Sequence, residues 1–421
     1  MTPPGVWFYF YAMIAMKNIQ AARGRIQSRI YCSPCAYSET VSQMAGNRVF
    51  FKLDNLQMTG SFKERGALNR LLTLSRGEAE RGVIAASAGN HGMAVAFHSQ
   101  RLGIPSTIVM PVHAPLIKVS WVQRYGARTV LHGEDYDAAF EEAQRLRVDK
   151  DLTFIHAFDD PEIVAGQGTL GLELLEQNPE LEAVIVPVGG GGLIAGVALA
   201  IKESAPKTRI IGVQAEQLPA MIAAVEKGAV VHLPSATTIA DGIAVRAVGK
   251  IPLELVKKYV DDIVTVSEAE IANAILLLLE IEKTVAEGAA AVPLAALINR
   301  KVELTGKKVA LIVSGGNIDM NLISRIIEKG LIQDGRLARL SVTLTDRPGS
   351  LARLTECLGK ERANILQIEH VRGFGEIAIG ETEVELILET TGREHIHRIN
   401  EALRGEGLRI NVGPSKDKPR T

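Results

Sequence analysis

The feature that most constrains this chain is a long alternation between short apolar runs and amphipathic stretches. The apolar runs are rich in β-branched residues, and helical patterns of about 10–20 residues separate them. Buried strands that alternate with helices predict parallel sheets covered on both faces, an α/β architecture. The predicted strands are VFFKLD (49–54), GVIAAS (82–87), STIVMP (106–111), RTVLHG (128–133), DLTFIHAF (151–158), AVIVPVGG (183–190), RIIGVQAE (209–216) and KVALIVSGG (308–316).

The pattern changes after residue 330. Residues 331–338 are predicted to be a linker, and residues 339–415 follow the order β-α-β-β-α-β of a ferredoxin-like domain. Residues 17–330 then form the main domain, with a smaller subdomain at about 55–155. The predicted C-terminal strands are 338–346, 364–372, 381–390 and 408–413, and the predicted helices are 350–363 and 393–407.

Residues 1–16 form an apolar, aromatic-rich extension. It lacks the basic stretch and the cleavage site of a signal peptide, and it is shorter than the roughly 20 residues that span a bilayer. Two interpretations stay open: an arm that packs on the protein or on a second copy, or a start placed too early, with Met13 or Met16 as the true first residue.

Charge and cysteine content limit the partners and the compartment. The formal net charge is -1, which disfavours nucleic acid and anionic membranes as partners. Three cysteines are too few for a disulfide framework and are typical of a reducing cytoplasm. We therefore expect a cytoplasmic protein without a nucleic-acid or membrane partner.

A lysine lies in the stretch TGSFKERG (59–66). Ser61 is the predicted N-cap of a helix over Ser61–Leu74. The positive end of a helix disfavours an ammonium group, which suits Lys63 to imine formation. Taken alone, Lys63 is equally well explained as a solvated helix residue.

Three further turns follow predicted strands. The turn Ser87, Ala88, Gly89, Asn90 and His91 opens a helix, so its amides can bind a carboxylate, and Asn90 suits a phenolic oxygen. The run Gly189, Gly190, Gly191 and Gly192 predicts close approach of a phosphate. Ser314, in VSGGN, can face a ring nitrogen. Each turn alone could be structural, and the spacing is not that of a dinucleotide site.

Together these motifs resemble the fold-type II pyridoxal-phosphate (PLP) enzymes, within them the branch of threonine dehydratase (threonine ammonia-lyase) and serine racemase. The matching stretches, over residues 17–325, are KLDNLQMTGSFKERGALN, SAGNHGMAVA, AGQGTLGLE, PVGGGGL and SGGN. The resemblance implies a two-domain α/β fold and PLP as cofactor. It also implies the β-elimination of L-threonine to 2-oxobutanoate and ammonia, and of L-serine to pyruvate.

The resemblance also implies residue roles. Lys63 becomes the Schiff-base lysine and the base for the substrate Cα proton. Gly189 to Gly192 bind the phosphate, Asn90 the ring hydroxyl and Ser314 the ring nitrogen. The turn from Ser87 to His91 holds the substrate carboxylate.

The C-terminal domain resembles the ACT domains. The residues that carry this resemblance are Asp346, Arg347, Pro348, Gly349 and Ser350, followed by Asn364 and Ile365. It implies pairing between subunits, in a homodimer or homotetramer, and binding of an amino acid. Because the product of the catalytic domain leads toward isoleucine, we expect a branched-chain amino acid as the effector, with isoleucine first. A purely structural dimerisation module is the alternative.

Two other activities remain as alternatives: a serine racemase or serine dehydratase, and a non-catalytic amino-acid sensor. A racemase of this branch needs a serine at the position of Ala88, so racemisation should be minor. Its divalent cation site also needs a carboxylate where this chain has Ile222. Glu216 alone remains as a possible cation ligand.

Overall fold

The computed structural model describes residues 14–372 and 378–411. Residues 1–13 of the extension and residues 412 and 413 of the last predicted strand therefore lie outside the described residues. The chain divides into two compact units, Met1–Ile318 and Asp319–Thr421. The boundary lies earlier than the predicted end of the main domain at residue 330.

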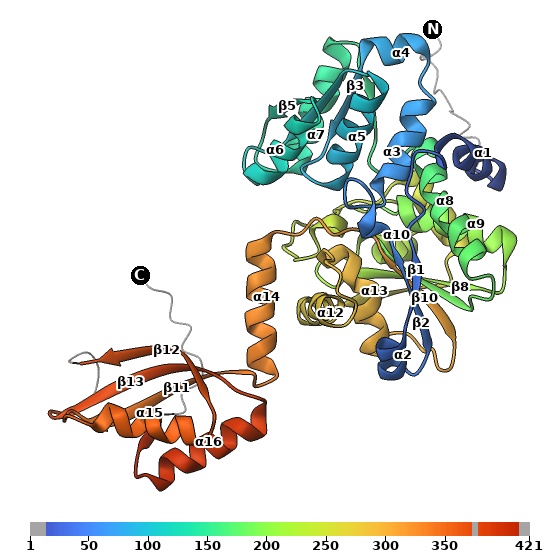
Figure 1. Cartoon of the computed structure of the whole chain (residues 1–421). Coiled ribbons are helices and arrows are strands. Elements are labelled where there is room, and N and C mark those ends of the chain that lie inside the picture. The colour runs from blue at the N-terminus through green and yellow to red at the C-terminus, as the bar shows by residue number, and fades with distance from the viewer. Residues whose placement is uncertain (1–13, 373–377, 412–421) are drawn as a thin grey trace. The chain divides into compact units, whose positions relative to one another are not determined.

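The first unit contains a large, mostly parallel sheet in the order β1-β2-β10-β7-β8-β9 (Figure 1). Strand β1 runs antiparallel to β2, and every other neighbouring pair is parallel. The sequence predicted neither β1 nor β9. The strands are β1 Cys35–Ser38, β2 Arg48–Leu53, β7 Ala183–Pro187, β8 Arg209–Ala215, β9 Asp262–Val266 and β10 Lys308–Val313.

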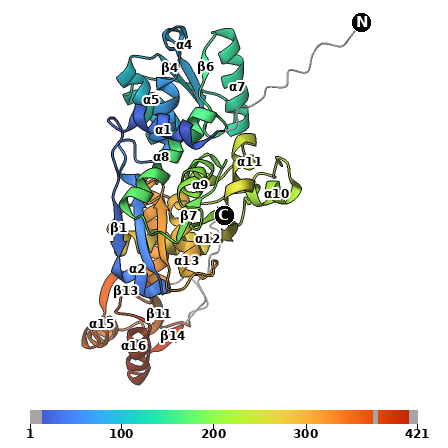
Figure 2. The same cartoon turned by 90° about the vertical axis from the view of Figure 1, so that its right-hand side faces the viewer.

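A second sheet in the same unit is parallel throughout, in the order β5-β4-β3-β6. Each sheet with its helices forms a separate lobe (Figure 2). The strands are β3 Val83–Ala86, β4 Ser106–Met110, β5 Arg128–Leu131 and β6 Thr153–Phe154.

Helices cover both sheets, as near-continuous apolar strands require. Strands β3 and β7 are buried along their whole length. The helices of this unit are α1 Met16–Ile26, α2 Glu39–Ala45, η1 Asp54–Leu56, α3 Lys63–Leu72, α4 Arg76–Arg81, α5 Asn90–Leu102, α6 Leu116–Arg124, α7 Tyr136–Asp149, α8 Pro161–Gln177, α9 Gly192–Ser204, α10 Ala220–Lys227, η2 Asp241–Ile243, α11 Lys250–Tyr259, α12 Glu268–Glu280 and α13 Gly288–Ile298.

The predicted α/β class with parallel sheets is confirmed, but the predicted strand 151–158 is too long. Strand β6 ends at Phe154. The backbone then turns at His156, whose Nδ1 accepts hydrogen bonds from the amides of Phe158 (3.2 Å) and Asp159 (2.8 Å). Apolar content alone could not reveal this turn, because Ala157 and Phe158 are apolar for a different reason: they line a cavity.

The second unit contains a ferredoxin-like fold. Its antiparallel sheet has the order β12-β13-β11-β14, and two helices connect the strands. This is the predicted β-α-β-β-α-β arrangement. The elements are α14 Met320–Gln333, β11 Leu337–Thr345, α15 Ser350–Lys360, β12 Asn364–Val371, β13 Glu381–Glu389, α16 Arg393–Gly405 and β14 Arg409–Asn411.

The predicted linker at 331–338 is wrong. Helix α14 continues to Gln333, and β11 begins at Leu337. Gly335 has a left-handed φ of 69°, and the amide of Arg336 donates to the carbonyl of Leu331 (2.8 Å), a common way to end a helix. The guanidinium of Arg393 also donates to the Gln333 carbonyl (2.9 Å). The segment is therefore a helix end and a tight turn.

Within the described part of the chain, no helix is long and apolar enough to cross a bilayer.

A buried ionic network joins helix α3 to the large sheet and to α8. The Arg65 side chain is fully buried and donates to both carboxylate oxygens of Asp54 (2.7 and 2.9 Å) and both of Glu173 (2.7 and 2.8 Å). The buried ammonium of Lys52 also donates to Glu173 (2.7 Å). The two cations hold the pKa of Asp54 below its usual value against the opposing effect of burial. Helix α3 is therefore held at its first turn.

We expect Arg65→Ala to destabilise the first unit strongly. Loss of one partner from a buried ion pair leaves an uncompensated charge and costs about 3–5 kcal/mol. Urea unfolding followed by circular dichroism should show a large fall in the midpoint.

The matched control is Arg76→Ala, because the Arg76–Glu80 pair is exposed. An exposed pair contributes at most about 1 kcal/mol, so this midpoint should barely move. Equal midpoints for the two variants would contradict a structural role for the buried network.

Candidate functional site

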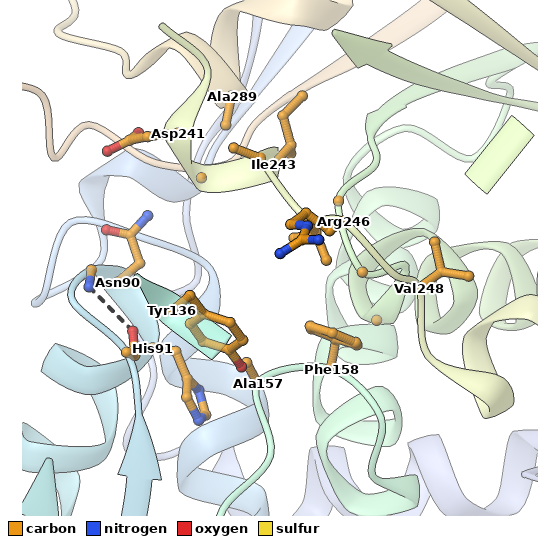
Figure 3. A pocket seen from close by; sticks show the side chains of 18 of the residues that line it. Asn90, His91, Tyr136, Ala157, Phe158, Asp241, Ile243, Arg246, Val248 and Ala289 are labelled. Atoms are coloured by element: carbon orange, nitrogen blue, oxygen red, sulfur yellow. Dashed lines mark hydrogen bonds between the residues drawn. The ribbon is translucent and has the colours of Figure 1, made fainter. Parts of the chain in front are cut away.

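A cavity of about 660 Å³ lies in the first unit and is lined by all the predicted catalytic and cofactor-binding residues. The turns that carry Ser87, Gly189 and Ser314 follow β3, β7 and β10. Carboxyl ends of parallel strands are where such sheets place ligands. Figure 3 shows Asn90 and His91 from α5, Phe158, and the segment from Asp241 to Val248 around this cavity.

Lys63 is placed by backbone pairing between two motifs. Ser61 forms a β-bridge with Gly315. On either side, the Phe62 amide donates to the Ser314 carbonyl (2.9 Å), and the Gly316 amide donates to the Gly60 carbonyl (2.9 Å). The lysine therefore begins α3 directly beside the end of β10.

The prediction that Ser61 caps this helix is wrong. Helix α3 begins at Lys63, its N-cap position is Phe62, and no side chain caps it. Ser61 is instead fully buried in the bridge, and its hydroxyl has no hydrogen-bond partner among the described residues.

The environment of Lys63 makes its ammonium group easier to deprotonate. Its Nζ donates to the Ala157 carbonyl (3.0 Å). Burial lowers the pKa of Lys63 to about 8, and the negative charge of Glu287 opposes part of this shift. A far larger neutral fraction exists near pH 7 than for an ordinary lysine, and the neutral amine is the form that attacks carbonyl groups.

The turn from Ser87 to Asn90 leads directly into α5, with Gly89 at the N-cap position. The Ser87 hydroxyl accepts a hydrogen bond from the Gly89 amide (3.2 Å), which tightens the turn. The first amides of a helix lack intrahelical acceptors and so can bind an anion. Ala88 also lines the cavity, with no polar side-chain atom.

The His91 side chain serves the structure of the turn. The imidazole is buried, and its Nε2 lies 2.9 Å from the Ile155 carbonyl. Burial lowers the pKa of His91 to about 3, with a further effect from Lys63, so the ring is neutral. The predicted role of His91 at a substrate carboxylate can therefore rest only on its backbone.

The four glycines from Gly189 to Gly192 precede and begin α9, with Gly191 at a left-handed φ of 95°. A Cβ on Gly190 would lie 2.4 Å from the Phe158 ring, and one on Gly191 would lie 2.5 Å from Met221 Cε. The sequence assigned these glycines to ligand approach alone. The structure adds a second reason, which is dense packing behind the turn.

Ser314 and Asn317 bring the last motif to the cavity. Ser314 is buried at the end of β10. The Asn317 amide donates to the Thr59 carbonyl (2.7 Å) and to Asn90 Oδ1 (2.8 Å). Asn317 belongs to the SGGN stretch, yet nothing in the sequence pattern pointed to this bridging role.

Sequence reasoning missed Glu287. The carboxylate is buried in the cavity wall and accepts hydrogen bonds from Asn90 Nδ2 at both oxygens (2.9 Å each). Burial raises the pKa of Glu287 to about 7, and the Asp241 carboxylate adds to the shift. One signal was available: Glu287 directly precedes the entirely buried, apolar stretch 288–297, where a charged residue is unexpected.

Two ion pairs join the lobes beside the cavity. Lys118 on α6 pairs with Asp241 (2.9 Å), and Asp137 on α7 pairs with Arg246 (2.6 Å). All four residues line the cavity. Asp241 begins the stretch DGIAV (241–245), whose charge partners could not be identified from the sequence.

The predicted regulatory residues do not come together within one chain. In the pairing with β13, Thr345 is opposite Glu381, whereas Asn364 is opposite Glu389 at the other end of that strand. The turn from Asp346 to Ser350 and the pair Asn364–Ile365 therefore lie at opposite ends of the sheet.

The two groups of residues have separate contacts within the second unit. Gly349 has a φ of 90° at the start of α15, and Asp346 pairs with Arg372 (3.1 Å). The Asn364 side chain donates to Glu389 (2.9 Å).

The possible cation ligand Glu216 is exposed after β8, and Ile222 lies on α10. Across residues 14–372 and 378–411, no cluster of three or more metal-ligating side chains occurs.

The cavity has the chemistry that PLP needs. It presents an amine with a lowered pKa, backbone amides beside glycines whose missing Cβ atoms leave the turn accessible, and a hydroxyl at the end of β10. These groups match the aldehyde, the phosphate and the ring nitrogen of the cofactor.

Comparisons with known proteins agree with this fit. A family model described as pyridoxal-phosphate dependent enzyme matches residues 26–315. The chain is 46% identical over 400 residues to an L-threonine ammonia-lyase of Thermotoga maritima, covering 95% of this chain and 100% of that protein.

Solved structures are also similar. The processed form of threonine deaminase isoform 2 from Solanum lycopersicum has a TM-score of 0.71 at 36% identity, covering 74% of this chain and 91% of that one. Maize serine racemase has a TM-score of 0.72 at 33% identity, covering 76% and 99%.

We expect Gly190→Ala to destabilise the first unit by about 1–3 kcal/mol, because the new methyl group overlaps the Phe158 ring. Thermal unfolding measures this effect. The control is Gly24→Ala in α1, where no atom lies within 4 Å of the added Cβ and helix propensity favours alanine. A Gly190→Ala protein as stable as the parent would show that the turn can relax around a side chain.

Proposed function

This chain belongs to the pyridoxal-phosphate-dependent enzyme family and uses that cofactor, and from this premise we propose that it deaminates L-threonine to 2-oxobutanoate and ammonia. The similarity to an L-threonine ammonia-lyase along the full length of that protein supports this substrate. Elimination removes water from the substrate, and hydrolysis of the released enamine restores it. The net products are therefore one 2-oxo acid and one ammonia. L-Serine, which lacks only the terminal methyl group, is expected as a second substrate that gives pyruvate.

The observation that carries the proposal is that Lys63 lines the same cavity as the Ser87–His91 turn, the Gly189–Gly192 turn and Ser314. When bound, PLP draws electron density away from the Cα–H bond of the substrate. Lys63 Nζ then takes the Cα proton, because its lowered pKa makes the neutral amine available near pH 7. The pairing of residues 60–62 with 314–316 fixes the start of α3 and so the origin of this side chain.

The other groups that line the cavity orient the cofactor and the substrate. Amides of the Gly189–Gly192 turn, at the N-terminus of α9, bind the phosphate, and those of the Ser87–His91 turn bind the substrate carboxylate. Asn90 contacts the ring hydroxyl, and Ser314 faces the ring nitrogen. A neutral hydroxyl does not hold a proton on that nitrogen. The bound cofactor would then withdraw electrons less strongly, which would favour prompt loss of the substrate β-hydroxyl.

Two alternatives are less well supported. A racemase delivers a proton to the opposite face of the substrate, and Ala88 has no proton to deliver. A non-catalytic sensor has no need for a lysine amine whose pKa is lowered inside the cavity.

Release of 2-oxo acid from L-threonine tests the proposal directly. The PLP-loaded protein should form 2-oxobutanoate, and Lys63→Ala should lower kcat by about 10²–10⁴-fold or more, because the base is lost. The variant should also lack the visible absorbance of the lysine-bound cofactor.

Lys227→Ala, at an exposed position on α10, is the control and should retain full activity. Undiminished turnover by Lys63→Ala would refute the assignment of the base. Absence of 2-oxobutanoate from the loaded parent protein would refute the proposed substrate.

We further propose that the second unit regulates the enzyme as a homodimer or homotetramer in the cytoplasm. The turn from Asp346 to Ser350 supports a carboxylate-binding role, because Gly349 is the N-cap of α15 and the first amides of a helix lack intrahelical acceptors. The effector is a branched-chain amino acid, with isoleucine the first choice because 2-oxobutanoate has the carbon skeleton that leads toward it.

We expect isoleucine to lower activity through a coupling of about 5–150-fold in apparent affinity. Truncation after Ile318, at the boundary between the units, should preserve turnover and abolish this response. The family match ends at residue 315, which supports a self-sufficient catalytic unit. If no amino acid alters the activity of the full chain and truncation changes only its oligomeric state, the second unit is a structural module.

A further inference from the structure

Glu287 is a buried carboxyl group that the proposed mechanism does not use. It occupies the N-cap position of α13, but its side chain does not cap that helix. Its amide donates to the Gly315 carbonyl (3.0 Å), and the amides of Ala290 and Ala291 donate to its own carbonyl. The backbone is therefore held from both sides while the side chain lines the cavity.

Two glycines leave room for this carboxyl group. A Cβ on Gly315 would lie 2.5 Å from Glu287 Oε1, and one on Gly242 would lie 3.0 Å from the same oxygen. Gly315 belongs to the SGGN motif and Gly242 to the DGIAV stretch. Both motifs are therefore shaped around Glu287 as well as around a ligand.

The carboxylate is partnered by an amide and not by a cation. Among the described residues it forms no ion pair with lysine, arginine or histidine, and Asn90 Nδ2 donates to both of its oxygens. Seen from Asn90 Nδ2, the two carboxylate oxygens lie in similar directions, whereas the two N–H bonds of the amide point in widely different directions. One N–H of Asn90 therefore serves both oxygens, and the second remains for another acceptor.

The other end of the Asn90 amide is fixed too. Its Oδ1 accepts from Asn317 Nδ2, which also donates to the Thr59 carbonyl. With oxygen toward Asn317 and nitrogen toward Glu287, the Asn90 amide has one orientation that satisfies both neighbours. Glu287 in its charged form strengthens this preference, because hydrogen bonds to charged groups are the stronger ones.

We propose that Glu287 is a positioning residue, whose carboxylate orients Asn90 so that the free amide N–H meets the ring oxygen of PLP, and whose protonation weakens that hold. This inference rests on the proposed function for the identity of the cofactor. It adds a residue and a pH dependence that the elimination chemistry alone does not require.

The surroundings of Glu287 determine the direction of this dependence. The groups that face it are Asn90 from α5, Asp241 from η2, Lys118 from α6 and Lys63 from α3. Burial and Asp241 raise the pKa of Glu287 to about 7, and Asn90, Lys118 and Lys63 oppose the rise. Below this pH the carboxyl is protonated and Asn90 is held less firmly. Above pH 7 the charged carboxylate holds the Asn90 amide in one orientation.

The test follows the visible absorbance and the dissociation constant of PLP between pH 6 and 9, without substrate. The parent should show a transition near pH 7 and bind PLP about 10-fold more weakly on its acid side, the effect of one weakened charged hydrogen bond. Glu287→Gln keeps an acceptor oxygen for Asn90 but does not titrate, so this transition should disappear. Glu254→Gln, at an exposed position on α11, is the control and should retain it.

An unchanged transition in Glu287→Gln overturns the proposal. If that variant does not fold or load cofactor, Glu287→Asp decides. Its shorter side chain alters the contact with Asn90 and should move the midpoint, whereas a midpoint equal to that of the parent overturns the proposal. Because no threonine is present, failure here is distinct from failure of the proposed substrate, which the 2-oxobutanoate assay reports separately.

Discussion

The buried contact of Arg65 with Asp54 and Glu173 is the interaction on which the site depends. It joins η1, which directly follows β2, to the first turn of α3 and to the C-terminal part of α8, and the opposite charges compensate one another. Lys63 lies two residues before Arg65, so the same contact restricts the position of its backbone. Helix α3 therefore carries both Lys63, which must lose its charge to act as a base, and Arg65, which stays charged. Burial acts on both side chains, but Arg65 donates hydrogen bonds to two carboxylates, whereas the charge of Glu287 opposes only part of the effect of burial on Lys63.

The cavity combines backbone segments held by hydrogen bonds with two side chains, Lys63 and Glu287, whose pKa values are shifted toward 7. The turn after β3 comes from one sheet and the turns after β7 and β10 come from the other, and all three line the same cavity. The bridge between Ser61 and Gly315 links the segment before Lys63 directly to the turn after β10. Inside, the pKa of Lys63 is lowered to about 8 and that of Glu287 is raised to about 7, in both cases first by burial. A site that excludes water from one amine and one carboxyl group brings both into the range where proton transfer is easy.

The second unit shows how strand register separates residues that a motif groups together. The turn from Asp346 to Ser350 and the pair Asn364–Ile365 share a sequence resemblance, yet the pairing with β13 places them at opposite ends of the sheet. A site that used both sets would need two chains. Register is a property of paired strands, and the turns and side chains that set it act only after folding.

Local patterns in the sequence were enough to predict the α/β class, the ferredoxin-like topology and the stretches that line the cavity, because periodicity and glycine-rich turns are local properties. They did not predict that Ser61 enters a bridge instead of capping α3, or that residues 331–333 continue a helix. Glu287 was missed because its partner Asn90 lies 197 residues away along the chain. These contacts exist in the folded chain alone, because pairing between distant segments and loss of solvent arise when the elements pack.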